Sequence, residues 1–136
     1  MVTYVFDASA ILRYLDDEAG AERVEAIIND YLDGTCQVVV SAVNWGEVAT
    51  KLAQRYNKQQ FEAVFAELQV LGLEVIPVTA SRAIASGLFK AQKKIPYADA
   101  FGVELTASIP NSVLVTADFD VKPAAGDIKI EFLPKK

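Results

Sequence analysis

The sequence of 136 residues contains no histidine and a single cysteine, Cys36. The lack of histidine excludes Ser-His-Asp and Cys-His catalysis, ribonuclease chemistry that uses an imidazole as acid or base, and zinc sites that require histidine. A single cysteine excludes an intrachain disulfide and a multi-cysteine metal site, and it agrees with a reducing compartment such as the cytoplasm. Because Cys36 precedes the apolar run Val38–Val40, we interpret it as a small core residue rather than a reactive thiol.

The chain also lacks long apolar stretches and an excess of positive charge. No run approaches about 18 uninterrupted apolar residues, and the N-terminus MVTYVFDAS has neither a basic region nor a long apolar one, so we expect no membrane span and no signal peptide. A net charge of −5 argues against nonspecific nucleic-acid binding through bulk charge. It leaves open a nucleic-acid enzyme whose acidic residues surround metal ions.

What is present is an alternation of short apolar runs with helical patterns, which predicts one α/β domain over residues 1–136 with a mainly parallel sheet. We expect strands at Val2–Phe6, Gln37–Ser41, Leu73–Val78, Ser112–Thr116 and Ile128–Phe132. The helical pattern covers Ala8–Leu15, Ala21–Leu32, a helix capped by Asn44 and running through Tyr56, Gln59–Leu71, a helix capped by Thr79 or Ser81 and reaching Lys94, and Tyr97–Ser108. Pro77 places the third strand at an edge of the sheet or ends it.

Two aspartates follow predicted strands. Asp7 comes directly after the first strand, and Asp118 comes just after the strand Ser112–Thr116. In an open parallel sheet, functional groups gather beyond the carboxyl ends of the strands, so we expect both side chains at the same edge. Two structural interpretations remain open: Asp7 as the N-cap of the following helix, and Asp118 as a turn residue.

Two further acidic residues lie on predicted helices. Asp99 stands near the start of a helix that is apolar over most of its circumference, where a carboxylate needs backbone N–H groups, a basic side chain or a metal as partner. An interaction with the helix terminus alone would also explain it. Glu47 lies almost opposite the apolar face of its helix, so periodicity alone favours a solvated glutamate paired with Lys51.

Taken together and in this order, four segments resemble the PIN domain family and, within it, the VapC-type toxins. They are Phe6–Ser9, Ser41–Val48, Pro96–Ala100 and Leu114–Asp120. The resemblance implies a PIN-like three-layer α/β/α sandwich with a mainly parallel central sheet of four to five strands. It also implies a metal-dependent endoribonuclease that hydrolyses single-stranded RNA, acting as the toxin of a toxin–antitoxin pair.

The resemblance further implies a metal site. Mapped residue by residue, the family's acidic quartet falls on Asp7, Glu47, Asp99 and Asp118, which would be catalytic residues and would bind Mg²⁺ or Mn²⁺, with Glu47 at the rim. Oxygen ligands favour these hard cations, which activate water for attack on a phosphodiester. The supporting residues by the same mapping are Ser9, Thr116 and Asp120.

The same resemblance implies three partners: an RNA substrate, a cognate antitoxin whose tail occupies the active-site groove, and a second copy of the chain in a homodimer. Basic residues close in sequence to the acidic ones are candidates for contacts with the RNA backbone: Arg13, Lys90, Lys93, Lys94 and Lys122. They are equally explained as charges on solvated helix faces. The helices Ala21–Leu32 and Gln59–Leu71 supply apolar surface, which core packing would also use.

Alternative functions remain open. A catalytically silent PIN-fold module that binds a partner would keep the same fold. A receiver-like phosphoacceptor domain is less favoured because it needs adjacent acidic residues after the first strand, where only Asp7 stands. A phosphatase of the haloacid-dehalogenase type needs a second aspartate two residues after the nucleophile, where this chain has Ser9.

Overall fold

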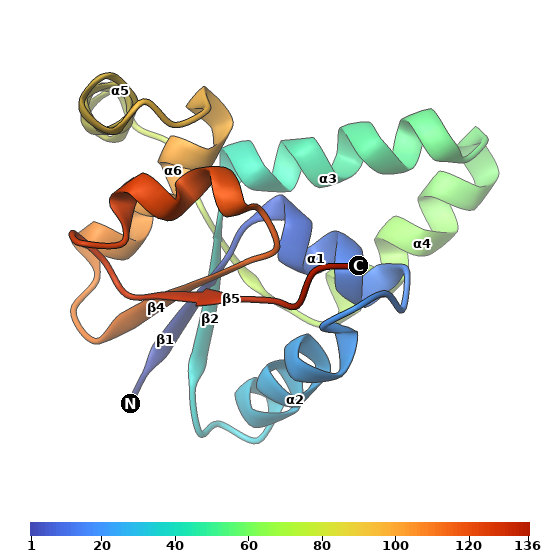
Figure 1. Ribbon diagram of the computed structural model, residues 1–136. Coiled ribbons are helices and arrows are strands. Elements are labelled where there is room, and N and C mark those ends of the chain that lie inside the picture. Colours follow the sequence, from blue (N-terminus) through green and yellow to red (C-terminus); the bar gives the residue numbers. More distant parts are fainter.

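A five-stranded sheet in the order β3-β2-β1-β4-β5 forms the centre of the computed structural model, which describes residues 1–136 (Figure 1). Its strands are β1 (Thr3–Phe6), β2 (Gln37–Ser41), β3 (Glu74–Ile76), β4 (Ser112–Thr116) and β5 (Ile130–Phe132). Every neighbouring pair is parallel, which confirms the predicted α/β class. Parallel strands must be joined by crossovers, and here most of those crossovers are helical.

Helices cover both faces of the sheet. They are α1 (Ala8–Leu15), α2 (Ala21–Leu32), α3 (Ala42–Arg55), α4 (Lys58–Val70), α5 (Ala80–Lys93), α6 (Tyr97–Ser108) and the short 3₁₀-helix η1 (Phe119–Ala124). Successive strand residues point to opposite faces. On β1, Phe6 therefore packs in one core cluster with residues of α1 to α4, and Val5 packs in a second cluster with residues of α6 and η1. This arrangement is the three-layer sandwich that the family resemblance implied.

The outer strands are shorter than the sequence predicted. The third strand covers only Glu74–Ile76, and the fifth begins at Ile130 instead of Ile128. Both lie at edges of the sheet, where a strand pairs with one neighbour only. Pro77 has no backbone N–H to donate, so the ladder of β3 ends before it.

The start of α3 corrects a sequence prediction. Asn44 was expected to cap this helix, but Ser41 does so: its hydroxyl accepts a hydrogen bond from the backbone N–H of Val43 at 3.3 Å. The prediction was wrong because the chain passes from β2 into α3 without a loop, so the last strand residue becomes the cap. Asn44 then lies in the first turn of the helix, fully buried.

The second acidic residue of α6 has a structural role. Glu104 is buried and accepts hydrogen bonds from Nη1 of Arg82 on α5, at 2.8 Å and 2.9 Å to its two carboxylate oxygens. A buried carboxylate without such a partner would be strongly destabilising. The pair therefore joins α5 to α6 and leaves Asp99 as the acidic residue of α6 that lines a pocket.

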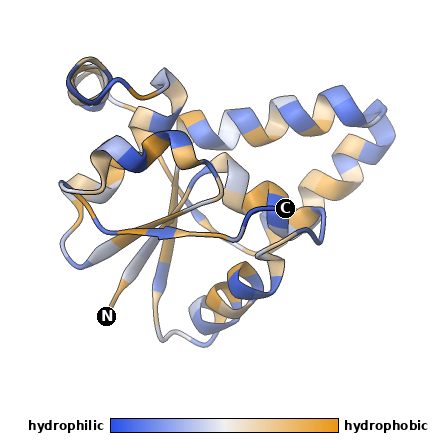
Figure 2. Cartoon of the chain, viewed as in Figure 1, coloured by the Kyte–Doolittle hydropathy of each residue, from blue (hydrophilic) through white to orange (hydrophobic).

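The distribution of hydropathy follows these layers. Figure 2 shows hydrophobic residues concentrated in the central strands, whereas the turn between α3 and α4 is hydrophilic. None of the helices combines the length and the apolar character that crossing a bilayer would require.

Candidate active site

The order in which the chain adds strands to the sheet reverses beside the central strand, β1. From β1 the chain builds β2 and β3 on one side, and then places β4 and β5 on the other. Phe6 pairs with Val115, so the next residues, Asp7 and Thr116, lie beside each other at the carboxyl ends of β1 and β4. Ligands of open α/β sheets bind in the crevice at such a switch point.

A pocket of about 160 Å³ opens at this crevice, and we call it the carboxylate pocket. It brings together the four acidic residues of the predicted quartet: Asp7 and Asp118 follow the ends of β1 and β4, and Glu47 and Asp99 lie on α3 and α6. The residues that line it are Asp7, Ala8, Ser9, Leu12, Glu47, Lys51, Asp99 and Asp118. Residues more than a hundred positions apart in the sequence therefore meet in one small space.

Asp7 is buried and held by several hydrogen bonds. Its Oδ1 accepts from the hydroxyl of Ser9 at 2.7 Å and from the backbone N–H of Ala10 at 3.0 Å. Its Oδ2 accepts from the hydroxyl of Thr116. Asp7 is thus the N-cap of α1 as well as a wall of the carboxylate pocket, so both interpretations of this residue apply. The predicted supporting residues Ser9 and Thr116 both contact its carboxylate.

Asp118 and Asp99 face each other across the pocket. One carboxylate oxygen from each of Asp99, Asp118 and Asp120 lies within 4.8 Å of the other two. Asp118 also caps η1, because its Oδ1 accepts from the backbone N–H of Asp120 at 2.9 Å. Oδ2 of Asp99 is buried and has no hydrogen-bond partner. An anionic oxygen buried in this way requires a proton or a cation.

Glu47 is anchored by Asn44, a residue to which the sequence assigned only a capping role. Nδ2 of Asn44 donates to Oε1 of Glu47 at 2.8 Å and to the backbone carbonyl of Ala98 at 3.2 Å. Asn44 therefore joins α3 to the first turn of α6, next to Asp99. The expected ion pair between Glu47 and Lys51 does not form. The spacing of three residues between Asn44 and Glu47 was the signal in the sequence.

Helix α6 approaches the sheet closely behind the pocket, at Gly102. A Cβ atom at this position would lie 3.3 Å from Cδ1 of Leu114 and 3.4 Å from Oδ1 of Asn44. The lack of a side chain here lets α6 carry Asp99 up to Asp7 and Asp118.

Burial and mutual repulsion perturb two of the four carboxylates. Burial raises the pKa of Asp7 from 3.8 to about 6, although its three hydrogen bonds oppose the rise. Burial also raises the pKa of Asp99 to about 8, assisted by a hydrogen bond and repulsion from Asp118. Desolvation and like charges favour the protonated form of each group, and a bound cation would remove both effects. The unpartnered oxygen and the all-oxygen donor set fit Mg²⁺ or Mn²⁺.

A wider groove of about 480 Å³ adjoins the carboxylate pocket and shares Ser9, Leu12, Lys51 and Asp118 with it. We call it the basic groove because four cationic side chains line it. Its lining residues are Ser9, Leu12, Arg13, Asp16, Glu18, Lys51, Arg55, Ala117, Asp118, Phe119 and Lys136. Of the basic residues proposed from the sequence, only Arg13 is among them.

The four lysines proposed from the sequence as RNA contacts line neither the carboxylate pocket nor the basic groove. Lys93 forms an ion pair of 2.9 Å with Asp127, and Nζ of Lys90 lies 3.5 Å from the carbonyl of Ile95. Lys122 stands over the ring of Phe119, 5.4 Å from its centroid, and Lys94 caps the end of α5. The cations that line the basic groove beside Arg13 are instead Lys51, Arg55 and Lys136. Their distance in sequence from the aspartates gave no indication of this position.

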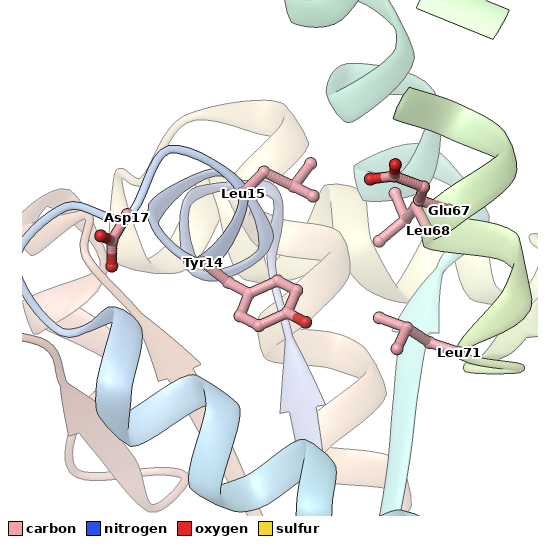
Figure 3. A pocket seen from close by; sticks show the side chains of 6 residues that line it. All are labelled: Tyr14, Leu15, Asp17, Glu67, Leu68 and Leu71. Carbon is pink, nitrogen blue, oxygen red and sulfur yellow. The ribbon is translucent and has the colours of Figure 1, made fainter. Parts of the chain in front are cut away.

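A third hollow, of about 290 Å³, lies between α1 and α4 and contains none of the predicted site residues. Figure 3 shows the ring of Tyr14 on α1 directed toward Leu71 at the end of α4. Four of its six lining residues are hydrophobic. Its chemistry therefore fits contact with an apolar side chain better than catalysis.

Comparison with protein families gives a match over most of the chain. The model of the PIN domain family covers residues 4–126. The chain belongs to the PIN domain family. All four segments on which the predicted resemblance rests lie within the matched region. No curated protein sequence gives a significant match to this PIN domain.

Solved structures share the fold. The structure of VapBC2 from Rickettsia felis bound to a promoter DNA fragment matches with a TM-score of 0.75 at 14% identity, covering 98% of this chain and 100% of that one. DNA-bound VapBC from Salmonella typhimurium matches with a TM-score of 0.70 at 16% identity, covering 97% and 98%. FitAcB from Neisseria gonorrhoeae matches with a TM-score of 0.68 at 21% identity, covering 93% and 95%. At these identities the likeness shows the fold alone.

Proposed function

We propose that this PIN domain protein is a metal-dependent endoribonuclease that hydrolyses phosphodiester bonds of single-stranded RNA. One observation carries the proposal: four carboxylates line one pocket of about 160 Å³ at the switch point of the sheet. Their mutual repulsion has no structural purpose in a protein that only needs to fold, and functional sites are where such perturbed groups gather. A catalytically silent PIN module would need no such cluster.

Asp7, Asp99 and Asp118 would hold the divalent cation, with Glu47 at the rim and Asp120 beside Asp118. When bound, a divalent cation supplies the Lewis acidity and positive charge that phosphodiester hydrolysis requires, which a chain without histidine must obtain elsewhere. Ser9 and Thr116 keep the carboxylate of Asp7 in one orientation through their hydroxyl groups. Asn44 does the same for Glu47.

The proposal is tested by titrating Mn²⁺ into the purified protein in a calorimeter and assaying the same samples for RNA cleavage. We expect binding of Mn²⁺, cleavage of single-stranded RNA in Mg²⁺ or Mn²⁺, and loss of cleavage in a chelator. A duplex of the same sequence is the control substrate. A preparation free of any bound partner that neither binds the metal nor cuts RNA would favour the silent binding module.

We further propose that the nuclease is the toxin of a toxin–antitoxin pair, restrained by a cognate antitoxin. Two observations support a protein partner. The fold matches those of VapBC complexes, and the hollow between α1 and α4 is lined mainly by hydrophobic residues; Val70, next in the chain to its lining residue Leu71, is 84% exposed.

A homodimer is the third part of the proposal, and an apolar stripe on α5 supports it. Ile84 and Leu88 are 68% and 55% exposed and stand one helical turn apart. We expect the double variant Ile84→Asp, Leu88→Asp to convert a dimer to a monomer in light scattering, because it buries two charges in the contact. Val70→Asp, at an exposed apolar site elsewhere, is the control. A wild-type monomer, or a double variant that stays dimeric, would contradict this assignment.

A further inference from the structure

One side of α3 leads from the carboxylate pocket into the basic groove. Glu47, Lys51 and Arg55 follow one another at intervals of four residues, so they lie along the same side of the helix. Glu47 lines the carboxylate pocket, Arg55 lines the basic groove, and Lys51 lines both. Lys51 is the only cation among the residues that line the carboxylate pocket.

Two of the four cations of the basic groove are free of carboxylate partners. Arg55 forms an ion pair of 2.5 Å with Asp16, and Lys136 forms one of 2.6 Å with Glu18. By contrast, Nη1 of Arg13 donates to two backbone carbonyls, at 2.7 Å and 2.8 Å, so its charge is not neutralised by a carboxylate. Lys51 is exposed and takes part in no ion pair. Both free charges are therefore available to an anion.

An aromatic ring lines the basic groove beside these charges. Phe119 follows Asp118 directly, and its ring is stacked on Phe132 with centroids 4.8 Å apart and planes 9° from parallel. Nζ of Lys135 and Nζ of Lys122 lie 4.9 Å and 5.4 Å from the centroid of Phe119, so a base that stacks on this ring displaces these flexible side chains and leaves their positive charge beside it. Cations that follow a backbone together with an aromatic ring on which a base can stack are the combination found in single-strand binding grooves.

We propose that the basic groove binds the RNA strand on one side of the cleaved bond, with Lys51 contacting the phosphate next to the carboxylate pocket and Phe119 stacking on a base. This inference rests on the proposed nuclease function. Four carboxylates in a protein of net charge −5 repel a polyanion, so cations close to the cleaved bond must offset that repulsion. Lys51 is placed to do so because it borders both cavities.

The two contacts have different signatures in solution. Each phosphate contact on a single strand contributes about 0.7 to the slope of log affinity against log salt concentration. Lys51→Ala is therefore expected to reduce that slope by about 0.7 and to weaken binding several-fold for every RNA sequence. Phe119→Leu keeps apolar contact with Phe132 but loses the stacking surface, so it is expected to weaken binding about five-fold with the slope unchanged.

The experiment measures fluorescence anisotropy of a short labelled single-stranded RNA on the full chain over a range of salt concentrations, in a chelator so that the strand stays intact. Lys51→Arg keeps the charge and is expected to retain the wild-type slope. Lys58→Ala removes an exposed lysine outside the groove and is the matched control. Cleavage in Mg²⁺ is then assayed on the same proteins, and we expect Lys51→Ala to raise KM.

The outcomes separate the groove from the nuclease function. If the wild type cuts RNA and Lys51→Ala matches Lys58→Ala in affinity, slope and KM, the groove proposal is wrong and the proposed nuclease function stands. If the wild type neither binds nor cuts RNA, both fall. If only Phe119→Leu loses affinity, the assignment of Lys51 to a phosphate is overturned.

Discussion

Asp99→Asn is expected to lower the rate of single-stranded RNA cleavage by about 10³-fold, equivalent to about 4 kcal/mol of lost transition-state stabilisation. Asn keeps the shape of the side chain but removes the negative charge that a hard divalent cation prefers. Asp99 matters more than its neighbours because its Oδ2 is buried without a partner, whereas Asp7 and Asp118 already accept hydrogen bonds. Single-turnover cleavage in Mg²⁺ and calorimetric titration of Mn²⁺ measure the two consequences.

The same substitution is expected to leave the fold intact, which separates lost chemistry from lost structure. At about pH 8 the metal-free variant should be more stable than the wild type by about 2 kcal/mol, after allowance for solvent screening of this half-buried group. Asp30→Asn, an exposed aspartate outside the site, is the control for removing one negative charge. Full activity in a clean Asp99→Asn preparation would refute the proposed role.

The free energy of unfolding of the metal-free protein is expected to fall as the pH rises from about 4 to about 8. Folding raises the pKa of Asp7 from 3.8 to about 6 and that of Asp99 to about 8, so in this range the folded protein holds protons that the unfolded chain has released. Stability falls with pH wherever the folded state binds more protons. The contribution is fully present below about pH 4 and lost above about pH 8. Asp7 alone accounts for about 3 kcal/mol.

Urea denaturation in a chelator at a series of pH values measures this effect. Asp7→Asn should flatten the curve only between about pH 4 and pH 6, whereas Asp99→Asn should flatten it over the whole range from about pH 4 to pH 8. Added Mg²⁺ or Mn²⁺ should restore stability at the upper end, because a ligand that binds only the folded state stabilises it. Stability that is independent of pH in the chelator, or that rises over this range, would show that burial and repulsion do not raise the pKa values of Asp7 and Asp99 as the structure implies.

Much of the fold follows from local patterns in the sequence. Apolar runs such as Val38–Val40 predict strands, because the strands of a parallel sheet are buried on both faces, and Val38–Val40 is indeed buried within β2. The positions of Asp7 and Asp118 were predictable for the same reason, because the carboxyl ends of parallel strands meet at one edge. Element boundaries were less predictable: Ser41 and Asn44 are both good caps, and only the direct passage from β2 into α3 selects Ser41.

The sequence by itself determined the class of fold, the acidic edge of the sheet and the absence of any imidazole. Only the tertiary structure decided which face of α3 meets the site: periodicity favoured a solvated Glu47, but packing of α3 against α6 places Asn44 between Glu47 and Ala98. The tertiary structure also decided which cations lie beside the site. Lys93 is near Asp99 in sequence but pairs with Asp127, whereas Lys51 lines the carboxylate pocket. Spacing along one element fixes which side chains share a face, and long-range packing alone decides what that face meets.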